Sequence, residues 1–203
     1  SNPTGTIIAR EGLSEIFQSV AERGGALVVD EIYQGLVYDT DSYSALEVSD
    51  DIFIINSFSK YFGMTGWRLG WLVAPEEYIP ALDCLAQNIF LSCSAPAQHA
   101  ALRAFSPECR EIMETRRSAF RQRRDFLVPA LRALGFKIEV VPDGAFYLYA
   151  DCSSLTDDSF AFAYDLLDAE GVAITPGKDF GKNNPERYVR FAYTTGIEKM
   201  EEG

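Results

Sequence analysis

Hydrophobic positions in the first half of the chain follow first a helical and then a strand-like spacing. In residues 11–23, Leu13, Ile16, Phe17 and Val20 fall on one face of a helix. Short continuous apolar runs come next, and such runs are typical of buried strands. The predicted strands cover residues 26–29, 52–55 and 67–73. Strands that alternate with helices indicate an α/β fold whose partial, mostly parallel sheet is covered by helices.

The pattern changes in the second half of the chain. A long charged helix is predicted over about residues 107–134, where Pro129 should kink or divide it. After Gly135, alternating residues predict short strands on either side of a Pro-Asp-Gly turn. The helices predicted near 76–90 and 96–105 precede this change. After Gly135, the predicted elements are a helix near 159–170 and strands at 137–141, 145–149, 172–174 and 188–193. This mixture is typical of a smaller α+β domain.

The change of pattern predicts a domain boundary near residue 107. Residues 1–107 would form the C-terminal part of a large domain, and residues 108–203 a small C-terminal domain that begins with the long linking helix. The chain opens on the turn residues Ser-Asn-Pro-Thr-Gly and has no initiator Met. We therefore expect a fragment of a longer protein.

The composition is that of a folded, acidic protein. Of the 203 residues, 47% are hydrophobic and 13% are aromatic, which favours a packed core over disorder. The 18 basic and 30 acidic residues give a net charge of −12, which argues against binding of nucleic acid or an anionic membrane through bulk charge. No apolar run reaches the roughly 18 to 20 residues of a membrane helix.

The cysteines and the single histidine argue against several kinds of site. Cys84, Cys93, Cys109 and Cys152 form no CxxC pair and have no metal-ligand spacing. We therefore expect reduced thiols, a cytoplasmic location and no metal site. Because His99 is the only histidine, a His-based catalytic triad is not expected.

Lys60 lies in the segment with the strongest chemical signal. The apolar run 52–55 leads into Ser57 and Ser59, and Arg68 follows after two glycines. A lysine at the end of a buried strand is shielded from water, which favours its neutral, nucleophilic amine. The hydroxyls and the guanidinium are suitable ligands for a phosphate. A lysine that can form a Schiff base beside a phosphate site indicates pyridoxal phosphate.

Three further residues fit the same cofactor. Asp30 ends a predicted buried strand, where a carboxylate is costly unless it meets a cation. A pyridinium nitrogen supplies that cation, and the carboxylate would keep the ring protonated. Tyr33 and Asn2 could both donate a hydrogen bond to the phenolic oxygen of the ring.

Four motifs occur in a fixed order along the chain: Asn2-Pro3-Thr4-Gly5, Asp30-Glu31-Ile32-Tyr33, Ser57-Phe58-Ser59-Lys60 and Gly66-Trp67-Arg68-Leu69-Gly70. Their letters, order and spacing resemble those of the class I/II pyridoxal-phosphate-dependent aminotransferases of fold type I. The resemblance runs over essentially the whole chain and includes Arg190-Phe191-Ala192-Tyr193. It implies that an upstream half, with a glycine-rich phosphate loop and a ring-stacking aromatic residue, is missing here.

The resemblance implies roles for the residues expected to carry the chemistry. Lys60 resembles the lysine that attaches the cofactor and then shuttles a proton. Asp30 resembles the partner of the ring nitrogen. Tyr33 and Asn2 resemble the donors to the phenolic oxygen.

The resemblance also implies the binding residues. Ser57 and Arg68 resemble phosphate ligands, and Ser59 is a weaker match to the same role. Arg190 resembles the arginine that binds the substrate α-carboxylate, and its planar fork suits a carboxylate.

The implied function is amino-group exchange between an amino acid and a 2-oxo acid, as part of amino acid metabolism. The implied protein is a cytoplasmic homodimer. Two alternatives stay open. The same scaffold supports a pyridoxal-phosphate-dependent β-lyase. A related domain can also serve as a non-catalytic, cofactor-binding sensor in a transcription regulator.

Overall fold

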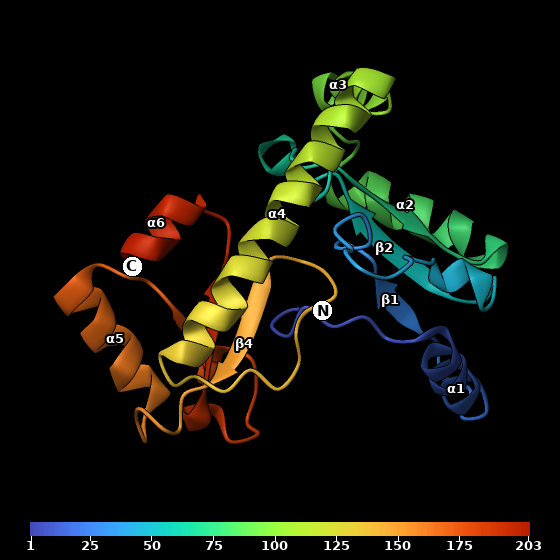
Figure 1. Ribbon diagram of the computed structural model, residues 1–203. Coiled ribbons are helices and arrows are strands. Elements are labelled where there is room, and N and C mark those ends of the chain that lie inside the picture. The colour runs from blue at the N-terminus through green and yellow to red at the C-terminus, as the bar shows by residue number, and fades with distance from the viewer. The chain divides into compact units, whose positions relative to one another are not determined.

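A computed structural model describes all 203 residues of the chain. The chain forms two compact units, each of which contains its own small sheet (Figure 1). The first unit comprises residues 8–116, and the second comprises residues 1–7 and 117–203. The division falls inside the long helix α4 (Pro107–Ala133), between residues 116 and 117. That these units correspond to the two expected domains stays a prediction.

The first unit is a three-stranded sheet in the order β1-β2-β3 with helices around it. Its elements are α1 (Arg10–Ala21), β1 (Val28–Asp30), β2 (Phe53–Ser57), β3 (Gly70–Val73), α2 (Ile79–Ile89) and α3 (Ala95–Ala104). β1 and β2 are parallel, whereas β2 and β3 are antiparallel. The prediction of a mostly parallel sheet is therefore wrong for one of the two strand pairs. The loop between β2 and β3 contains only a short 3₁₀ turn, and a parallel pair would usually need a helical crossover.

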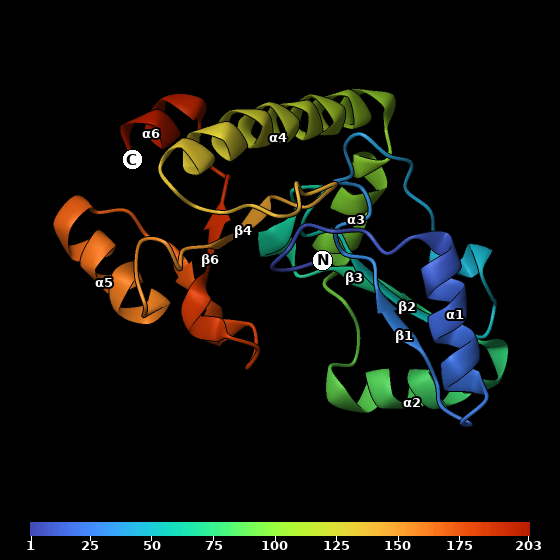
Figure 2. The same cartoon turned by 60° about the horizontal axis from the view of Figure 1, so that its bottom comes forward.

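The two faces of this first sheet are covered unequally. Leu13 of α1 packs with Ile54 in a buried cluster on one face, and Figure 2 shows α1 alongside β1 and β2. On the other face, Ile55 and Leu72 are 47% and 43% exposed. The prediction of a buried strand at residues 26–29 is also wrong, because Val28 is 56% exposed.

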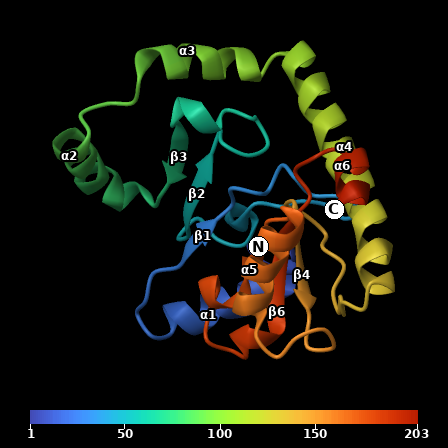
Figure 3. The same cartoon turned by 90° about the vertical axis from the view of Figure 1, so that its left-hand side faces the viewer.

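The second unit contains an antiparallel sheet in the order β4-β6-β5. Its elements are β4 (Tyr147–Asp151), α5 (Ser159–Glu170), β5 (Thr175–Pro176), β6 (Tyr188–Ala192) and α6 (Ile197–Glu202). Leu148 and Val189 are fully buried and pack with Leu127 and Leu131 of α4. Helix α5 lies beside β6 (Figure 3). This sheet therefore has a well-formed core.

Several predicted elements differ in the second unit. Helix α5 spans the predicted residues, but the predicted strand 137–141 is reduced to the single bridge between Lys137 and Asp151. The strand predicted at 172–174 forms instead at Thr175–Pro176. Helix α4 runs through Pro129 without a break, since the many remaining hydrogen bonds of a 27-residue helix outweigh the one that proline removes.

Two general features of the structure bear on its possible sites. No helix is both long enough and apolar enough to cross a lipid bilayer. The structure also contains no group of three or more His, Cys, Asp or Glu side chains arranged to hold a metal ion.

Candidate active site

The candidate site lies at the carboxyl-terminal edge of the first sheet. Because β1 and β2 are parallel, Asp30 at the end of β1 and Ser57 at the end of β2 are on the same edge. Gly70 pairs with Ser57, which brings the preceding residues, including Arg68, to this edge. In sheets with parallel strands, ligands bind outside the carboxyl ends of the strands. The tertiary structure thus gathers residues from three of the four sequence motifs.

Two neighbouring acids at the end of β1 have different surroundings. Oδ1 of Asp30 accepts a hydrogen bond from the Ile32 backbone N–H at 3.0 Å, an Asx turn that directs the chain into the next loop. Oε1 of Glu31 accepts from the Ala45 backbone N–H at 2.7 Å and so holds another loop in place. Asp30 is exposed rather than buried as expected, because β1 is an outer strand and Val28 on the same strand is also exposed. Asp30 is therefore the acid available to a ligand at this edge.

Lys60 and Tyr33 meet in the loops that follow the two parallel strands. Nζ of Lys60 lies 5.8 Å from the centroid of the Tyr33 ring, within the range of a cation–π contact. Lys60 is half-buried, as is Tyr33. The structure therefore brings together a primary amine and a phenol that are 27 positions apart in the sequence.

A set of hydroxyl groups lies directly before Lys60 in the chain. Oγ of Ser57 is 2.9 Å from Oγ of Ser59 and accepts a hydrogen bond from the Ser59 backbone N–H at 3.0 Å. Ser59 is buried, and its carbonyl accepts from Oγ1 of Thr65 at 2.7 Å. These bonds fix two serine hydroxyls next to each other, an arrangement that suits the oxygens of a phosphate.

Arg68 has an unusual backbone conformation at the end of the same loop. Its φ of 52° is left-handed, which is uncommon for a residue with a side chain. The guanidinium is exposed, and its Nη1 donates to the Thr65 carbonyl at 3.2 Å. Strained backbone of this kind concentrates at functional sites. The residue thus supplies a positive charge to the loop that holds Ser57 and Ser59.

The second unit contains a guanidinium site around Arg190. This residue lies on β6, the central strand of its sheet. Nη1 of Arg190 donates to Oδ1 of Asn2 at 2.8 Å, and Nη2 donates to Oγ1 of Thr175 at 3.2 Å. Nε is buried and has no hydrogen-bond partner. A carboxylate would satisfy such a donor, because it accepts two parallel hydrogen bonds from a guanidinium.

Two aromatic rings complete the surroundings of Arg190. Its Cζ lies 4.3 Å from the centroid of the Tyr147 ring and 4.7 Å from that of Phe180. The sequence did not assign roles to Tyr147, Phe180 or Thr175. For Thr175 the connection follows from the strand register, in which it lies opposite Arg190, and for Tyr147 and Phe180 it follows from their ring contacts in the folded chain.

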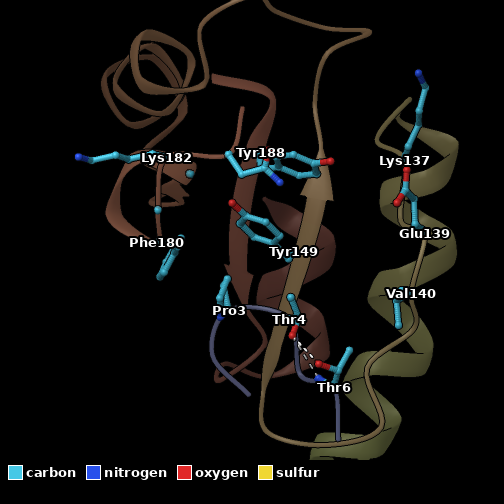
Figure 4. A pocket seen from close by; sticks show the side chains of 13 residues that line it. Pro3, Thr4, Thr6, Lys137, Glu139, Val140, Tyr149, Phe180, Lys182 and Tyr188 are labelled. Atoms are coloured by element: carbon cyan, nitrogen blue, oxygen red, sulfur yellow. Dashed lines mark hydrogen bonds between the residues drawn. The ribbon is translucent and has the colours of Figure 1, made fainter. Parts of the chain in front are cut away.

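A cavity of about 390 Å³ opens beside Phe180 in the second unit (Figure 4). Its wall includes Tyr149 and Tyr188, whose rings are stacked 4.9 Å apart, together with Pro3 and Phe180. Burial, followed by the neighbouring Tyr188, raises the pKa of the Tyr149 phenol. None of the predicted site residues lines the cavity, although Phe180 is shared with the surroundings of Arg190.

The predicted site residues are therefore divided between two compact units. Asp30, Tyr33, Ser57, Ser59, Lys60 and Arg68 belong to the first unit, and Asn2 and Arg190 belong to the second. The structure joins Lys60 to Tyr33 and Arg190 to Asn2. That all eight residues serve one bound cofactor and its substrate stays a prediction.

Known proteins match this chain over its whole length. The family model described as aminotransferase class I and II matches residues 1–203. The valine–pyruvate aminotransferase of Mycobacterium tuberculosis is 39% identical over 100% of this chain, which covers 53% of that protein. The aspartate/prephenate aminotransferase of Thermus thermophilus is 37% identical over 98% of this chain, which covers 51% of it.

A solved structure agrees with these relatives. The crystal structure of an aminotransferase from Mycobacterium tuberculosis has a TM-score of 0.94 and 40% identity, over 99% of this chain and 52% of that one. The chain thus spans about half the length of the curated relatives that it matches. The α/β fold, the ordered motifs and the family match over residues 1–203 of this chain lead to one conclusion. The chain belongs to the family of class I and II aminotransferases.

Proposed function

We propose that the protein that carries this chain is a pyridoxal-phosphate-dependent aminotransferase, which exchanges an amino group between an amino acid and a 2-oxo acid. One observation carries the proposal. Lys60 and Tyr33 meet at the sheet edge where Asp30 and Ser57 end their parallel strands. The family implies pyridoxal phosphate as the cofactor, and the relatives are named aminotransferases.

The residues of the first unit fit the reactive part of this cofactor. When bound, pyridoxal phosphate supplies an electron-accepting ring that makes bonds at the substrate Cα easier to break. Lys60 would hold the cofactor covalently, and its amine can accept and return a proton at Nζ. Asp30 would keep a proton on the ring nitrogen by its negative charge. Tyr33, with Asn2 of the second unit, would donate hydrogen bonds to the phenolic oxygen.

The remaining residues fit the anionic groups of cofactor and substrate. Ser57 and Ser59 would donate hydroxyl hydrogen bonds to the phosphate, and Arg68 would neutralise part of its charge. Arg190 would bind the α-carboxylate of the substrate, since it has a buried Nε–H without a partner. The substrate class is therefore an α-amino acid with a free carboxylate. Valine and aspartate, which the names of the two relatives contain, are the first to test.

Several broader features are proposed with the function. The first unit would be part of the large cofactor-binding domain of the family, and the second unit its smaller α+β domain. We also propose a cytoplasmic homodimer that acts on small molecules and binds neither nucleic acid nor membranes. The net charge of −12 and the four free thiols support this assignment.

The test of the function is chemical trapping at Lys60 in the complete protein. Borohydride reduction after incubation with pyridoxal phosphate should place one pyridoxyl group on Lys60, as identified by peptide mass spectrometry. Lys60→Ala should remove both the label and the transfer of amino groups from valine or aspartate to a 2-oxo acid. Lys199→Ala, an exposed lysine of α6, is the matched control and should keep both. Equal labelling of wild type and the Lys60 variant would rule out the assignment.

A further inference from the structure

Tyr61, the residue after Lys60, is tied to a distant helix. Its hydroxyl donates a hydrogen bond to Oε1 of Glu114 on α4 at 2.6 Å. Both side chains are half-buried, and the bond links positions 53 residues apart. A short hydrogen bond from a hydroxyl to a carboxylate is among the stronger kinds in proteins. The loop that carries Lys60 is thus attached to α4 immediately beside the lysine.

The ring of Tyr61 also contacts the loop that carries Tyr33. Gly35 lies so close to this ring that a Cβ atom at position 35 would overlap the ring carbons. Only a residue without a side chain permits this approach of backbone to ring. Gly35 belongs to the same turn as Tyr33. The Tyr33 carbonyl accepts a hydrogen bond from the backbone N–H of Leu36, the residue after Gly35. Tyr61 therefore connects α4 with the turn that positions Tyr33.

Two neighbouring residues, Phe62 and Gly63, also hold the loop that carries Lys60. The backbone N–H of Gly63 donates to the Lys60 carbonyl at 3.1 Å, and φ of Gly63 is +67°. Phe62 packs in an aromatic cluster, with ring centroids 4.7 Å from Phe58 and 5.6 Å from Phe105. The hydrophobic packing of this loop does not depend on the Tyr61 hydroxyl. That hydroxyl can therefore be removed while the loop keeps its core contacts.

We infer that Tyr61, held by Glu114, is a positioning residue that sets the place of the Lys60 amine relative to Tyr33. The inference rests on the proposed function of Lys60 and deepens it. Tyr61 itself does not react. Its ring lies between α4 and the Gly35 turn, so the hydrogen bond fixes both loops with one side chain. When the position of a catalytic amine is held less firmly, the reaction becomes slower even if the substrate still binds.

The test uses the complete protein and the Tyr61→Phe variant, which loses only the hydroxyl. We expect kcat to fall about tenfold, the factor of a lost hydrogen bond to a charged group, with KM nearly unchanged. Glu114→Gln keeps an acceptor oxygen and should recover most of the rate, whereas Glu114→Ala should behave like Tyr61→Phe. Tyr78→Phe is the matched control, because Tyr78 lies in the same unit and contacts Phe53 through its ring.

A second readout does not need the cofactor. Hydrogen–deuterium exchange of the protein without pyridoxal phosphate should be faster in residues 57–65 of Tyr61→Phe, and unchanged in Tyr78→Phe. Exchange and kcat that both equal those of the wild type would overturn the inference, even where Lys60 is trapped by borohydride. Faster exchange without any trapping at Lys60 would support the anchoring of the loop and overturn the proposed function instead.

Discussion

The two small sheets of this protein have the same number of strands but very different cores. In the second sheet, Leu148 and Val189 are 0% exposed, because residues of α4 pack directly against them. In the first sheet, Ile55 and Leu72 on one face are 47% and 43% exposed. The difference therefore comes from the cover of each sheet and not from its size.

This comparison shows that the better-packed sheet is not the one that carries the predicted lysine. The second sheet carries the larger buried cluster, whereas the first sheet carries Lys60, Tyr33 and Asp30 at its edge. Functional loops commonly lie in regions of lower local stability, because few buried contacts restrain them. The anchoring of Tyr61 by Glu114 adds restraint where the first sheet supplies little.

The largest expected effect is a difference in the free energy of unfolding between variants of the two sheets. Leu148→Ala should lower the free energy of unfolding of the full chain by about 3 kcal/mol, since a buried leucine leaves a cavity when truncated. Leu72→Ala should cost less than about 1 kcal/mol, because its side chain is already partly in water. Urea titration followed by circular dichroism measures both values. Equal losses in the two variants would refute the difference in core packing.

The next effect concerns a buried acid in the second unit. Asp151 is 1% exposed, and its Oδ2 accepts a hydrogen bond from Arg187 Nη2 at 2.6 Å. Burial alone would raise the pKa of Asp151, but hydrogen bonds from Ser153 and from Arg187 outweigh it and hold the pKa below its usual value. The ion pair is only partly shielded, because the Arg187 side chain is 44% exposed.

A lowered pKa in the folded state fixes the direction of the pH dependence. The stabilisation by Asp151 is complete above the unfolded-state pKa of about 3.9 and is lost as the pH falls through the lower, folded-state pKa. Asp151→Asn should reduce the free energy of unfolding by about 2 kcal/mol at pH 7 and flatten its decline in acid. Denaturant titrations between pH 7 and pH 3 measure this. If the variant lost stability in acid as the wild type does, the acid sensitivity would come from groups other than Asp151.

The smallest effect tests the exposed face of the first sheet. Leu72→Gln should change the free energy of unfolding by less than about 0.5 kcal/mol, as expected for a partly exposed side chain. It should nevertheless weaken the fluorescence of a bound hydrophobic dye, because it interrupts an apolar surface that includes Ile55. Leu134→Gln, which changes a leucine that is 66% exposed just beyond α4, is the control. Equal loss of fluorescence in both variants would count against a dye site on the sheet.

Local signals predicted some elements well. Helix α5 begins after Asp158, whose carboxylate accepts hydrogen bonds from the backbone N–H groups of Phe160 and Ala161, and it ends at Gly171 with φ of 70°. Such caps act over a few residues and can be recognised in the sequence. The segment 137–141 has strand-like alternation but pairs only through Lys137, because a strand also needs a neighbour of matching register.

The candidate site also divides into residues that local motifs pointed to and contacts that they could not predict. Short motifs predicted roles for Lys60, Asp30 and Arg190, since an amine, a carboxylate and a guanidinium each suit one part of the expected cofactor or substrate. No local pattern could predict the contact between Arg190 and Asn2, which are 188 positions apart. Nor could it assign Thr175 or Phe180 to Arg190, because these contacts depend on the register of the second sheet and on the loop that follows it.

The sequence by itself determined the family, the approximate positions of helices α1 to α5, and the types of side chain available for chemistry. These follow from local spacing and from the intrinsic properties of amines, carboxylates and guanidinium groups. Only the tertiary structure decided which strands pair, which sheet face is covered, and that Tyr61 joins Glu114 beside Lys60. Such outcomes depend on contacts between residues far apart in the chain, where packing and hydrogen bonding outweigh local preference.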